Sequence, residues 1–187
     1  SLVVGGLICL VAGVHYFYMR EVWASTGTSP TVFRYVDWIV TVPLQMVEFY
    51  LILAAVTAVS MGVFWRLLIG TVVMVVAGYM GEAGFINTTI GFVVAKAGWA
   101  YILYEIFSGE ASKSAANAKP SVQSAFNTMK WIVTIGWAIY PLGYFLGYLA
   151  GGTDEATLNI VYNVADFINK IGFCLAIWAA ATTEADA

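Results

Sequence analysis

Long apolar segments separated by short polar turns make up almost the whole chain. An α-helix rises 1.5 Å per residue and the hydrocarbon core of a bilayer is about 30 Å thick, so roughly 20 apolar residues are enough to cross it. Backbone groups without partners are costly in lipid, so each segment is predicted to be a helix rather than an open strand. The six segments are approximately Leu2 to Met19, Arg34 to Thr57, Val63 to Gly81, Thr88 to Phe107, Val122 to Ala150 and Thr157 to Ala181.

The connections between these segments are rich in residues that favour turns. They are Ser25 to Pro30, Gly81 to Gly84, Ser108 to Pro120 and Gly151 to Asp154. No linker or low-complexity stretch divides the chain. Residues 1–187 are therefore predicted to form a single all-α membrane bundle.

The composition supports a chain that lies in a lipid bilayer. Apolar residues make up 61% of the 187 positions and charged residues only 10%, against about 25% charged in ordinary soluble domains. The net charge of −3 and the dispersed basic residues leave no basic patch for nucleic acid. Cys9 and Cys174 are far apart in apolar stretches, which argues against a disulfide or metal framework. We expect neither a nucleic-acid partner nor a metal.

The basic residues of the connections predict the orientation. Consecutive spans alternate in direction, so the connections after the second and fourth spans lie on one side of the bilayer. Arg66, Lys113 and Lys119 belong to that side, with Lys130 close by in the fifth span. Basic loops remain in the cytoplasm, so the second span is predicted to run inward.

A polar stripe follows one face of the second span. Arg34, Asp37, Thr41, Gln45 and Glu48 are separated by 3, 4, 4 and 3 residues, which is the spacing of one helical face. Asp37 and Glu48 differ by only about 20° in azimuth and lie roughly 16 Å apart along the axis. A polar seam between helices is the alternative, but ionisable residues in a membrane span are costly and by default indicate a functional site.

The last span supplies an amine beside a carboxylate. Asp166 and Lys170 occupy positions i and i+4 of one face. This pair is either a structural ion pair or a site for a covalent imine, because burial favours the neutral, nucleophilic amine. Lys96 is a second lysine within a span, without an acid three or four residues away, and we expect its side chain to reach toward solvent.

Aromatic residues within the spans are candidates for the walls of a ligand pocket. Such residues more often pack between helices or anchor the membrane interface. Together with a central lysine and two acids they are able to enclose a long apolar ligand. They are Tyr16, Trp38, Trp99, Trp137, Tyr140 and Tyr162.

Three of these segments resemble signatures of the microbial rhodopsins. Residues 34–44, RYVDWIVTVPL, are similar to the third-helix signature of that family, and 166–170, DFINK, to its retinal-lysine motif. Residues 136–141, GWAIYP, resemble the sixth-helix segment that flanks retinal. The similarity runs along nearly the whole chain, and His15-Tyr16 with 48–50, EFY, resembles the proteorhodopsin group.

The resemblance implies a bundle of seven transmembrane helices. This sequence offers six, and its first span matches the second helix of the family. We therefore expect the six spans to be the second to seventh helices, with the first absent from this sequence. Localisation in the cell membrane, as a multi-pass protein of a bacterial-type inner membrane, and a ring-shaped homo-oligomer are implied by the family alone.

The resemblance also implies a light-driven outward proton pump. All-trans retinal would be bound to Lys170 as a protonated Schiff base, with Asp37 as counter-ion and proton acceptor and Asp166 as second counter-ion. Glu48 would return the proton, Arg34 would tune Asp37 from the outer side, and His15 would hydrogen-bond the acceptor. The implied retinal contacts are Trp38, Thr41, Gln45, Trp99, Trp137, Tyr140, Pro141, Tyr162 and Tyr16.

Glu48 and Asp37 distinguish between the functions that the sequence leaves open. A sensory rhodopsin of the same fold does not need a carboxylate donor, so Glu48 favours a pump; Asp37 disfavours chloride transport because it already supplies the negative charge. A transporter or receptor for a diffusible ligand would use the same stripe without retinal. Proteorhodopsins with Leu at the position of Gln45 tend to absorb green light and those with Gln blue light, so the resemblance implies a blue-absorbing pigment.

Overall fold

The computed structural model describes residues 1–185, which form helices joined by short turns. Six of the helical segments in this range are long and apolar enough to cross a membrane. The prediction of an all-helical membrane protein with six spans is confirmed. Five spans consist of α1 (Leu2–Thr26), α2 (Thr31–Ala54), α3 (Met61–Glu82), α4 (Thr88–Phe107) and α8 (Glu155–Ala185). The fifth span in chain order consists of α6 (Pro120–Trp131), α7 (Ile139–Tyr144) and the π-helical turns η1 (Ile132–Gly136) and η2 (Phe145–Leu149).

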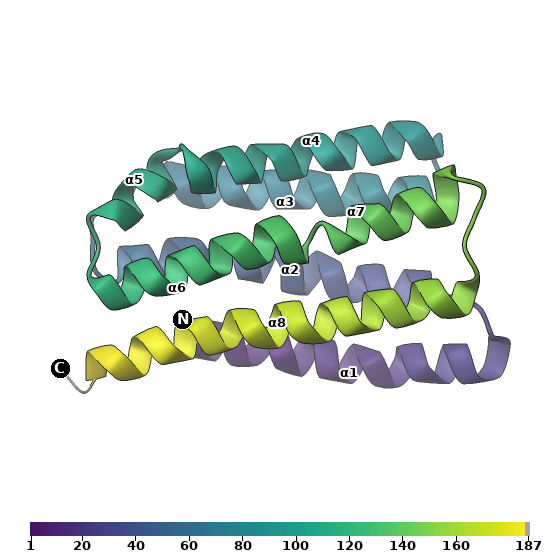
Figure 1. Ribbon diagram of the computed structural model, residues 1–187, viewed down its shortest axis with the longest axis horizontal. Helices are drawn as coiled ribbons and strands as arrows, with labels where there is room; N and C mark the ends of the chain where they lie inside the picture. The colour runs from purple at the N-terminus through teal and green to yellow at the C-terminus, as the bar shows by residue number, and fades with distance from the viewer. Residues whose placement is uncertain (186–187) are drawn as a thin grey trace.

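The spans run side by side along the long axis of the molecule (Figure 1). Helices α3 and α4 pack together at one side of the bundle, and α1 and α8 pack together at the other. Helix α2 contacts both α1 and α3, and the α6–α7 segment contacts α8. The interior between these two pairs is therefore enclosed by α2 on one side and by the fifth span on the other.

A short helix, α5 (Glu110–Ala116), occupies part of the connection that the sequence analysis treated as a polar turn. It is fixed by Arg66, whose Nε donates to Glu105 Oε2 and whose Nη2 donates to Glu110 Oε2, each at 2.8 Å. Glu105 also accepts a hydrogen bond of 2.9 Å from the backbone N–H of Ala111. These bonds join α3, α4 and α5 at one end of the bundle.

The fifth span departs from the continuous helix predicted for Val122 to Ala150. The turn η1 ends at Gly136, and α7 begins only at Ile139. Pro141 lacks the N–H that would bond the carbonyl of Trp137 four residues earlier, so the regular pattern is interrupted here. The carbonyl of Trp137 instead accepts a hydrogen bond of 3.2 Å from the N–H of Tyr140.

The predicted glycine turn before α8 is confirmed. Gly151 and Gly152 have φ values of 95° and 92°, a conformation that glycine adopts without strain. Asp154 then caps α8 by accepting a hydrogen bond of 2.8 Å from the N–H of Thr157. Hydrogen bonds from Thr157 hold the pKa of the exposed Asp154 carboxyl below its usual range.

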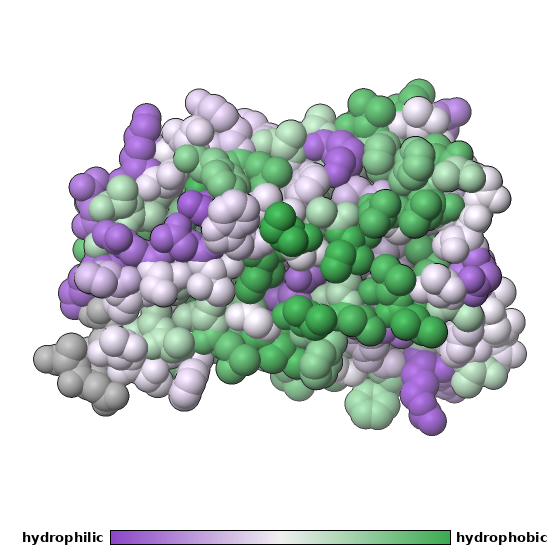
Figure 2. Space-filling model, in the orientation of Figure 1, coloured by the Kyte–Doolittle hydropathy of each residue, from purple (hydrophilic) through white to green (hydrophobic). Residues whose placement is uncertain are grey.

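The outer surface of the spans is apolar, as a chain surrounded by lipid requires. Phe17 of α1, Ile135 of η1 and Phe167 of α8 are exposed on different helices. Figure 2 shows hydrophobic side chains across the middle of this face and hydrophilic ones gathered at the end that carries α5. The exposed apolar residues surround the bundle at the depth of the hydrocarbon, which indicates a bilayer environment.

Glycines allow α3 and α4 to approach each other closely. A Cβ atom at Gly91 would lie 2.7 Å from the Cα of Gly81 and 2.9 Å from the carbonyl oxygen of Ala77. Both neighbours are backbone atoms, so they cannot move aside as a flexible side chain would. The contact between these two helices therefore depends on the absence of a side chain at Gly91.

Gly91→Ala is expected to lower the free energy of unfolding by about 1–3 kcal/mol, because α3 and α4 must separate to admit the methyl group. Unfolding in denaturant, followed by circular dichroism, measures the loss. Gly6→Ala in α1 is the matched control, since a Cβ there meets no atom within 4 Å. Equal stability of the Gly91→Ala and Gly6→Ala proteins would contradict the close contact.

Candidate functional site

An apolar cavity lies inside the bundle between α8 and α4. Its walls are mainly aromatic and aliphatic side chains with a few polar groups among them, as is usual for small-molecule sites. Lys170 and Asp166 of α8 reach it from one side, and Lys96 and Trp99 of α4 from the other. The predicted pocket residues that line it are Trp38, Gln45, Trp99, Trp137, Tyr140, Pro141 and Tyr162.

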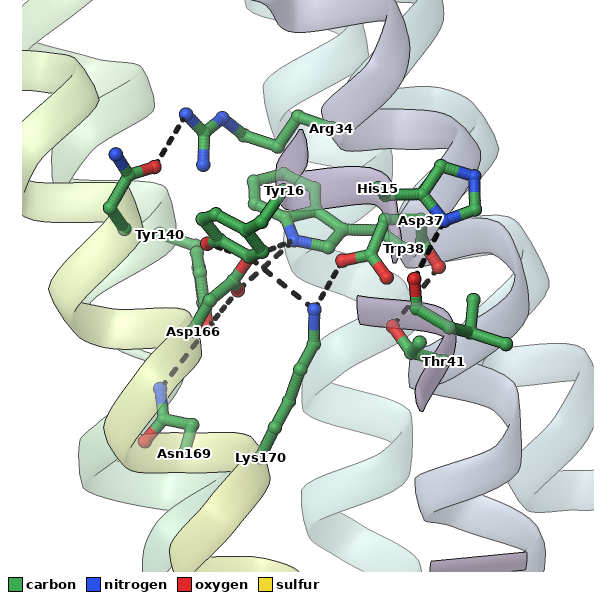
Figure 3. A network of polar contacts seen from close by, with 12 residues as sticks. His15, Tyr16, Arg34, Asp37, Trp38, Thr41, Tyr140, Asp166, Asn169 and Lys170 are labelled. Carbon is green, nitrogen blue, oxygen red and sulfur yellow. Dashed lines mark hydrogen bonds and ion pairs between the residues drawn. The ribbon is translucent and has the colours of Figure 1, made fainter. Parts of the chain in front are cut away.

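Lys170 lies in the interior with its amine between two carboxylates (Figure 3). Its Nζ donates a hydrogen bond to Asp37 Oδ2 and lies 3.3 Å from Asp166 Oδ2. All three residues are buried. A buried charge requires a partner of opposite sign, so the two acids stabilise a cation at this nitrogen.

The two carboxylates differ in their other partners. Asp166 accepts hydrogen bonds of 2.7 Å from the hydroxyls of Tyr16 and Tyr140, and one of 3.1 Å from Trp38 Nε1. Asp37 Oδ1 has no hydrogen-bond partner. Asp166 is therefore held by more hydrogen-bond donors than Asp37.

The polar stripe of α2 faces the interior along its whole length. Its five members, Arg34, Asp37, Thr41, Gln45 and Glu48, are at most 1% exposed. The structure thus brings these predicted residues to one buried face, with the carboxyl of Asp37 at the level of the Lys170 amine. Their roles remain predictions.

Arg34 lies at the N-terminal end of the stripe. Its Nη2 donates to Asn159 Oδ1 at 2.7 Å and to Asn163 Oδ1 at 3.0 Å, and the guanidinium lies 5.2 Å from the ring centre of Tyr162. These contacts hold a positive charge beyond Asp37. Arg34 Nε and Nη1 have no hydrogen-bond partner in the structure.

Glu48 lies at the opposite end of the stripe, without a partner for either carboxyl oxygen. It is fully buried. A buried carboxyl without a partner costs less free energy with a proton bound than as an anion. The carboxyl of Glu48 is therefore a candidate proton-binding group at this end of the stripe.

Three predicted residues make contacts other than those expected. Tyr16 and Thr41 are not among the residues that line the cavity: Tyr16 bonds Asp166, and the Thr41 hydroxyl donates to the main-chain oxygen of Asp37 at 3.0 Å. His15 Nδ1 lies 2.8 Å from the carbonyl oxygen of Val11. Within residues 1–185 no hydrogen bond joins His15 to Asp37.

Several polar residues of the site were not predicted from the sequence. Asn159 and Asn163 lie at spacings of 4 and 3 before Asp166, so they continue the polar face that leads to Lys170. This helical spacing was a signal that could have found them. Asn169 donates to the carbonyl of Gly136 at 3.0 Å and so links α8 to the π-helical turn.

The side chain of Lys96, expected to reach toward solvent, also lies at the cavity. Its half-buried side chain lines the cavity, and its Nζ lies 3.8 Å from the ring centre of Trp99. Trp99 is held in turn by a hydrogen bond of 3.0 Å from Nε1 to the carbonyl of Val133. The cavity wall thus carries an amine on each of two opposite sides.

Comparison with known sequences and structures identifies the family of this chain. Residues 1–184 match the family model described as bacteriorhodopsin-like protein. The chain is 54% identical to the green-light absorbing proteorhodopsin of Gamma-proteobacterium EBAC31A08, over 98% of this chain and 74% of that protein. It is 53% identical, with the same shares of coverage, to the blue-light absorbing proteorhodopsin of Gamma-proteobacterium Hot 75m4.

The solved structures agree with the sequence comparison. The crystal structure of the blue light-absorbing proteorhodopsin from Med12 superposes with a TM-score of 0.83 at 52% identity, over 97% of this chain and 82% of that chain. The family model, the relatives and the superposition all cover nearly the whole length of this chain. The chain belongs to the bacteriorhodopsin-like family of microbial rhodopsins, within its proteorhodopsin group.

Proposed function

We propose that the protein is a light-driven pump that moves protons outward, with all-trans retinal bound to Lys170 as a protonated Schiff base. The observation that carries this proposal is the buried Lys170 amine, held between Asp37 and Asp166 at one side of an apolar cavity. The relatives named above are light-absorbing proteins by their names. Residues 1–187 are proposed to form one retinal-binding transmembrane domain.

The cavity suits a long apolar ligand that carries one reactive carbonyl. Its walls are mainly aromatic and aliphatic, and a nucleophilic amine stands at one side. Gln45 lines the cavity, and its Nε2 has no hydrogen-bond partner. The lysine ammonium of the structure occupies the position proposed for the Schiff-base nitrogen, and the two carboxylates would balance its charge.

The proton acceptor is proposed to be Asp37. Retinal, when bound, supplies light absorption and an isomerisation that weakens the hold of the Lys170 nitrogen on its proton. Asp37 Oδ2 accepts a hydrogen bond from that nitrogen and has fewer other donors than Asp166, so a proton binds it at lower cost. Asp166 keeps its charge as the second counter-ion.

The proton donor is proposed to be Glu48, and the positive charge of Arg34 favours release on the opposite side. Glu48 lies on the same face of α2 as Asp37, toward the other end of the span. Arg34 is fixed beyond Asp37 by Asn159 and Asn163 and disfavours return of the proton from outside. His15, from the neighbouring helix α1, is proposed to tune Asp37.

The direction of transport follows from the basic residues at one end of the bundle. The end that carries α5 includes Arg66, Lys113 and Lys119 and is proposed to be cytoplasmic. Glu48 then lies toward the cytoplasm and Arg34 toward the outside. The six spans correspond in this proposal to the second to seventh helices of the fold, in the inner membrane of a bacterial-type cell. A ring-shaped homo-oligomer is the proposed assembly, implied by the family alone.

Addition of all-trans retinal to the purified protein is expected to produce a pigment that absorbs visible light. Lys170→Ala abolishes this pigment because no other lysine of the cavity lies beside carboxylates, whereas Lys96→Ala still forms it. Absorbance after retinal addition measures both. A colourless original protein, or a coloured Lys170→Ala protein, would refute the proposed attachment.

Asp37→Asn is expected to shift the pigment to longer wavelength and to stop light-induced acidification of a cell suspension, because acceptor and counter-ion are lost together.

Glu48→Gln is expected to keep the colour but to slow return of the proton to the Lys170 nitrogen by roughly 10²-fold or more. Flash photolysis measures that rate. Glu21→Gln, an exposed carboxyl of α1, is the control. An unchanged rate in Glu48→Gln would remove it from the donor role.

Gln45→Leu is expected to shift the absorption maximum to longer wavelength with pumping retained. Excitation moves positive charge away from the Schiff base, so a polar group near that end stabilises the ground state more than the excited state. We therefore propose a blue-absorbing pigment. Gln123→Leu, outside the cavity wall, is the control. A maximum that stays in place would leave Gln45 as a packing residue.

A further inference from the structure

Lys96 is a second amine of the cavity to which the proposed pump assigns no part. It lies near the middle of α4, so its side chain is at the depth of the hydrocarbon rather than at the interface. A charged residue at this depth is costly unless it faces the interior or finds a partner. The position of Lys96 in the cavity wall meets the first condition.

The partner of Lys96 is an aromatic ring rather than an acid. Its Nζ lies 3.8 Å from the ring centre of Trp99, within the distance at which a cation is attracted to the face of an indole. No carboxylate of residues 1–183 forms an ion pair with it. The ring attracts the ammonium without cancelling its charge, so a net positive charge faces the cavity.

The two amines stand on opposite sides of the cavity. Lys170 comes from α8, which packs with α1 and the fifth span, whereas Lys96 comes from α4, which packs with α3. Figure 1 shows α4 and α8 at opposite sides of the bundle. A retinal attached to Lys170 within this cavity would extend away from α8, with its ring end toward α4.

We propose that Lys96 sets the colour of the pigment by placing a positive charge beside the ring end of the bound retinal. This inference rests on the proposed function. Excitation moves positive charge from the Lys170 end toward the ring, and a fixed cation there repels it. The energy gap widens, and absorption moves to shorter wavelength. Lys96 thus acts in the same direction as Gln45, from the other end of the chromophore.

The low dielectric of the cavity makes this interaction effective. Coulomb energies fall with the effective dielectric constant, which in a protein interior is well below that of water. Salt does not screen a charge inside the bundle as it screens one at the surface. Position on the cavity wall, and not charge alone, therefore distinguishes Lys96 from the lysines that lie outside the cavity, such as Lys130.

The absorption maximum of the retinal-loaded protein tests the proposal. Lys96→Met and Lys96→Gln are expected to shift it to longer wavelength, because both remove the charge. Lys96→Arg keeps the charge and leaves the maximum nearly unchanged. Lys130→Met is the matched control, since Lys130 also lies over an aromatic ring, 4.9 Å from the centre of Phe107, but does not line the cavity.

The outcomes separate this inference from the proposed function. A pigment whose maximum stays in place in both Lys96→Met and Lys96→Gln overturns the role of Lys96 and leaves the pump intact. An equal shift in Lys96→Arg also overturns it, because the cause is then packing rather than charge. Loss of pigment in all three Lys96 variants would assign the residue to retinal binding instead of colour. No pigment in the original protein overturns the proposed function itself.

Discussion

A cation buried in hydrocarbon is the constraint on which the site depends. The Lys170 amine lies among apolar helices, where removing one partner of a buried ion pair costs about 3–5 kcal/mol. Two carboxylates, Asp37 of α2 and Asp166 of α8, form ion pairs with the amine and so offset the cost of burying it. Three side chains also donate hydrogen bonds to Asp166, whereas Asp37 Oδ1 has no partner among the described residues. The two acids are therefore unequal in the number of hydrogen bonds that they accept. In the proposed function, this inequality allows Asp37 to take up a proton while Asp166 holds its charge.

Side chains of two neighbouring helices hold Asp166 in place, and the interrupted backbone of the fifth span adds a further contact to α8. Trp38 reaches from α2 to Asp166 of α8, and Tyr140 reaches the same carboxylate from the fifth span. The interrupted backbone before Pro141 leaves the carbonyl of Gly136 free for Asn169. A Cβ atom at Gly136 would lie 2.0 Å from Asn169 Oδ1, so a side chain here would displace Asn169 from its hydrogen bond to the fifth span.

Most of the helices and one wall of the site could be predicted from sequence because both depend on periodicity. Six apolar runs define six spans, and spacings of three and four place the stripe of α2 on one face. The donors of Asp166 could not be predicted in this way, because their contacts join helices far apart in the sequence. Tyr16 was expected as a pocket wall and is a hydrogen-bond donor instead. Lys96 was expected in solvent, since nothing in its own helix shows that it faces a cavity.

The π-helical turn of the fifth span has a consequence for how this segment tolerates change. Each residue turns a helix by about 100°, so the wider turn at Ile132–Gly136 sets which side chains after it face inward. Deleting one residue from the α-helical part before Ile132 would rotate Trp137 and Tyr140 by about that angle relative to the residues before the deletion. A deletion within the π-helical turn would instead convert it to a regular α-helical turn and leave the side chains after it in place. Single substitutions alter one side chain and leave this register in place. The span is therefore permissive toward exchange of its lipid-facing residues, and the π-helical turn is the part of it that tolerates loss of a residue.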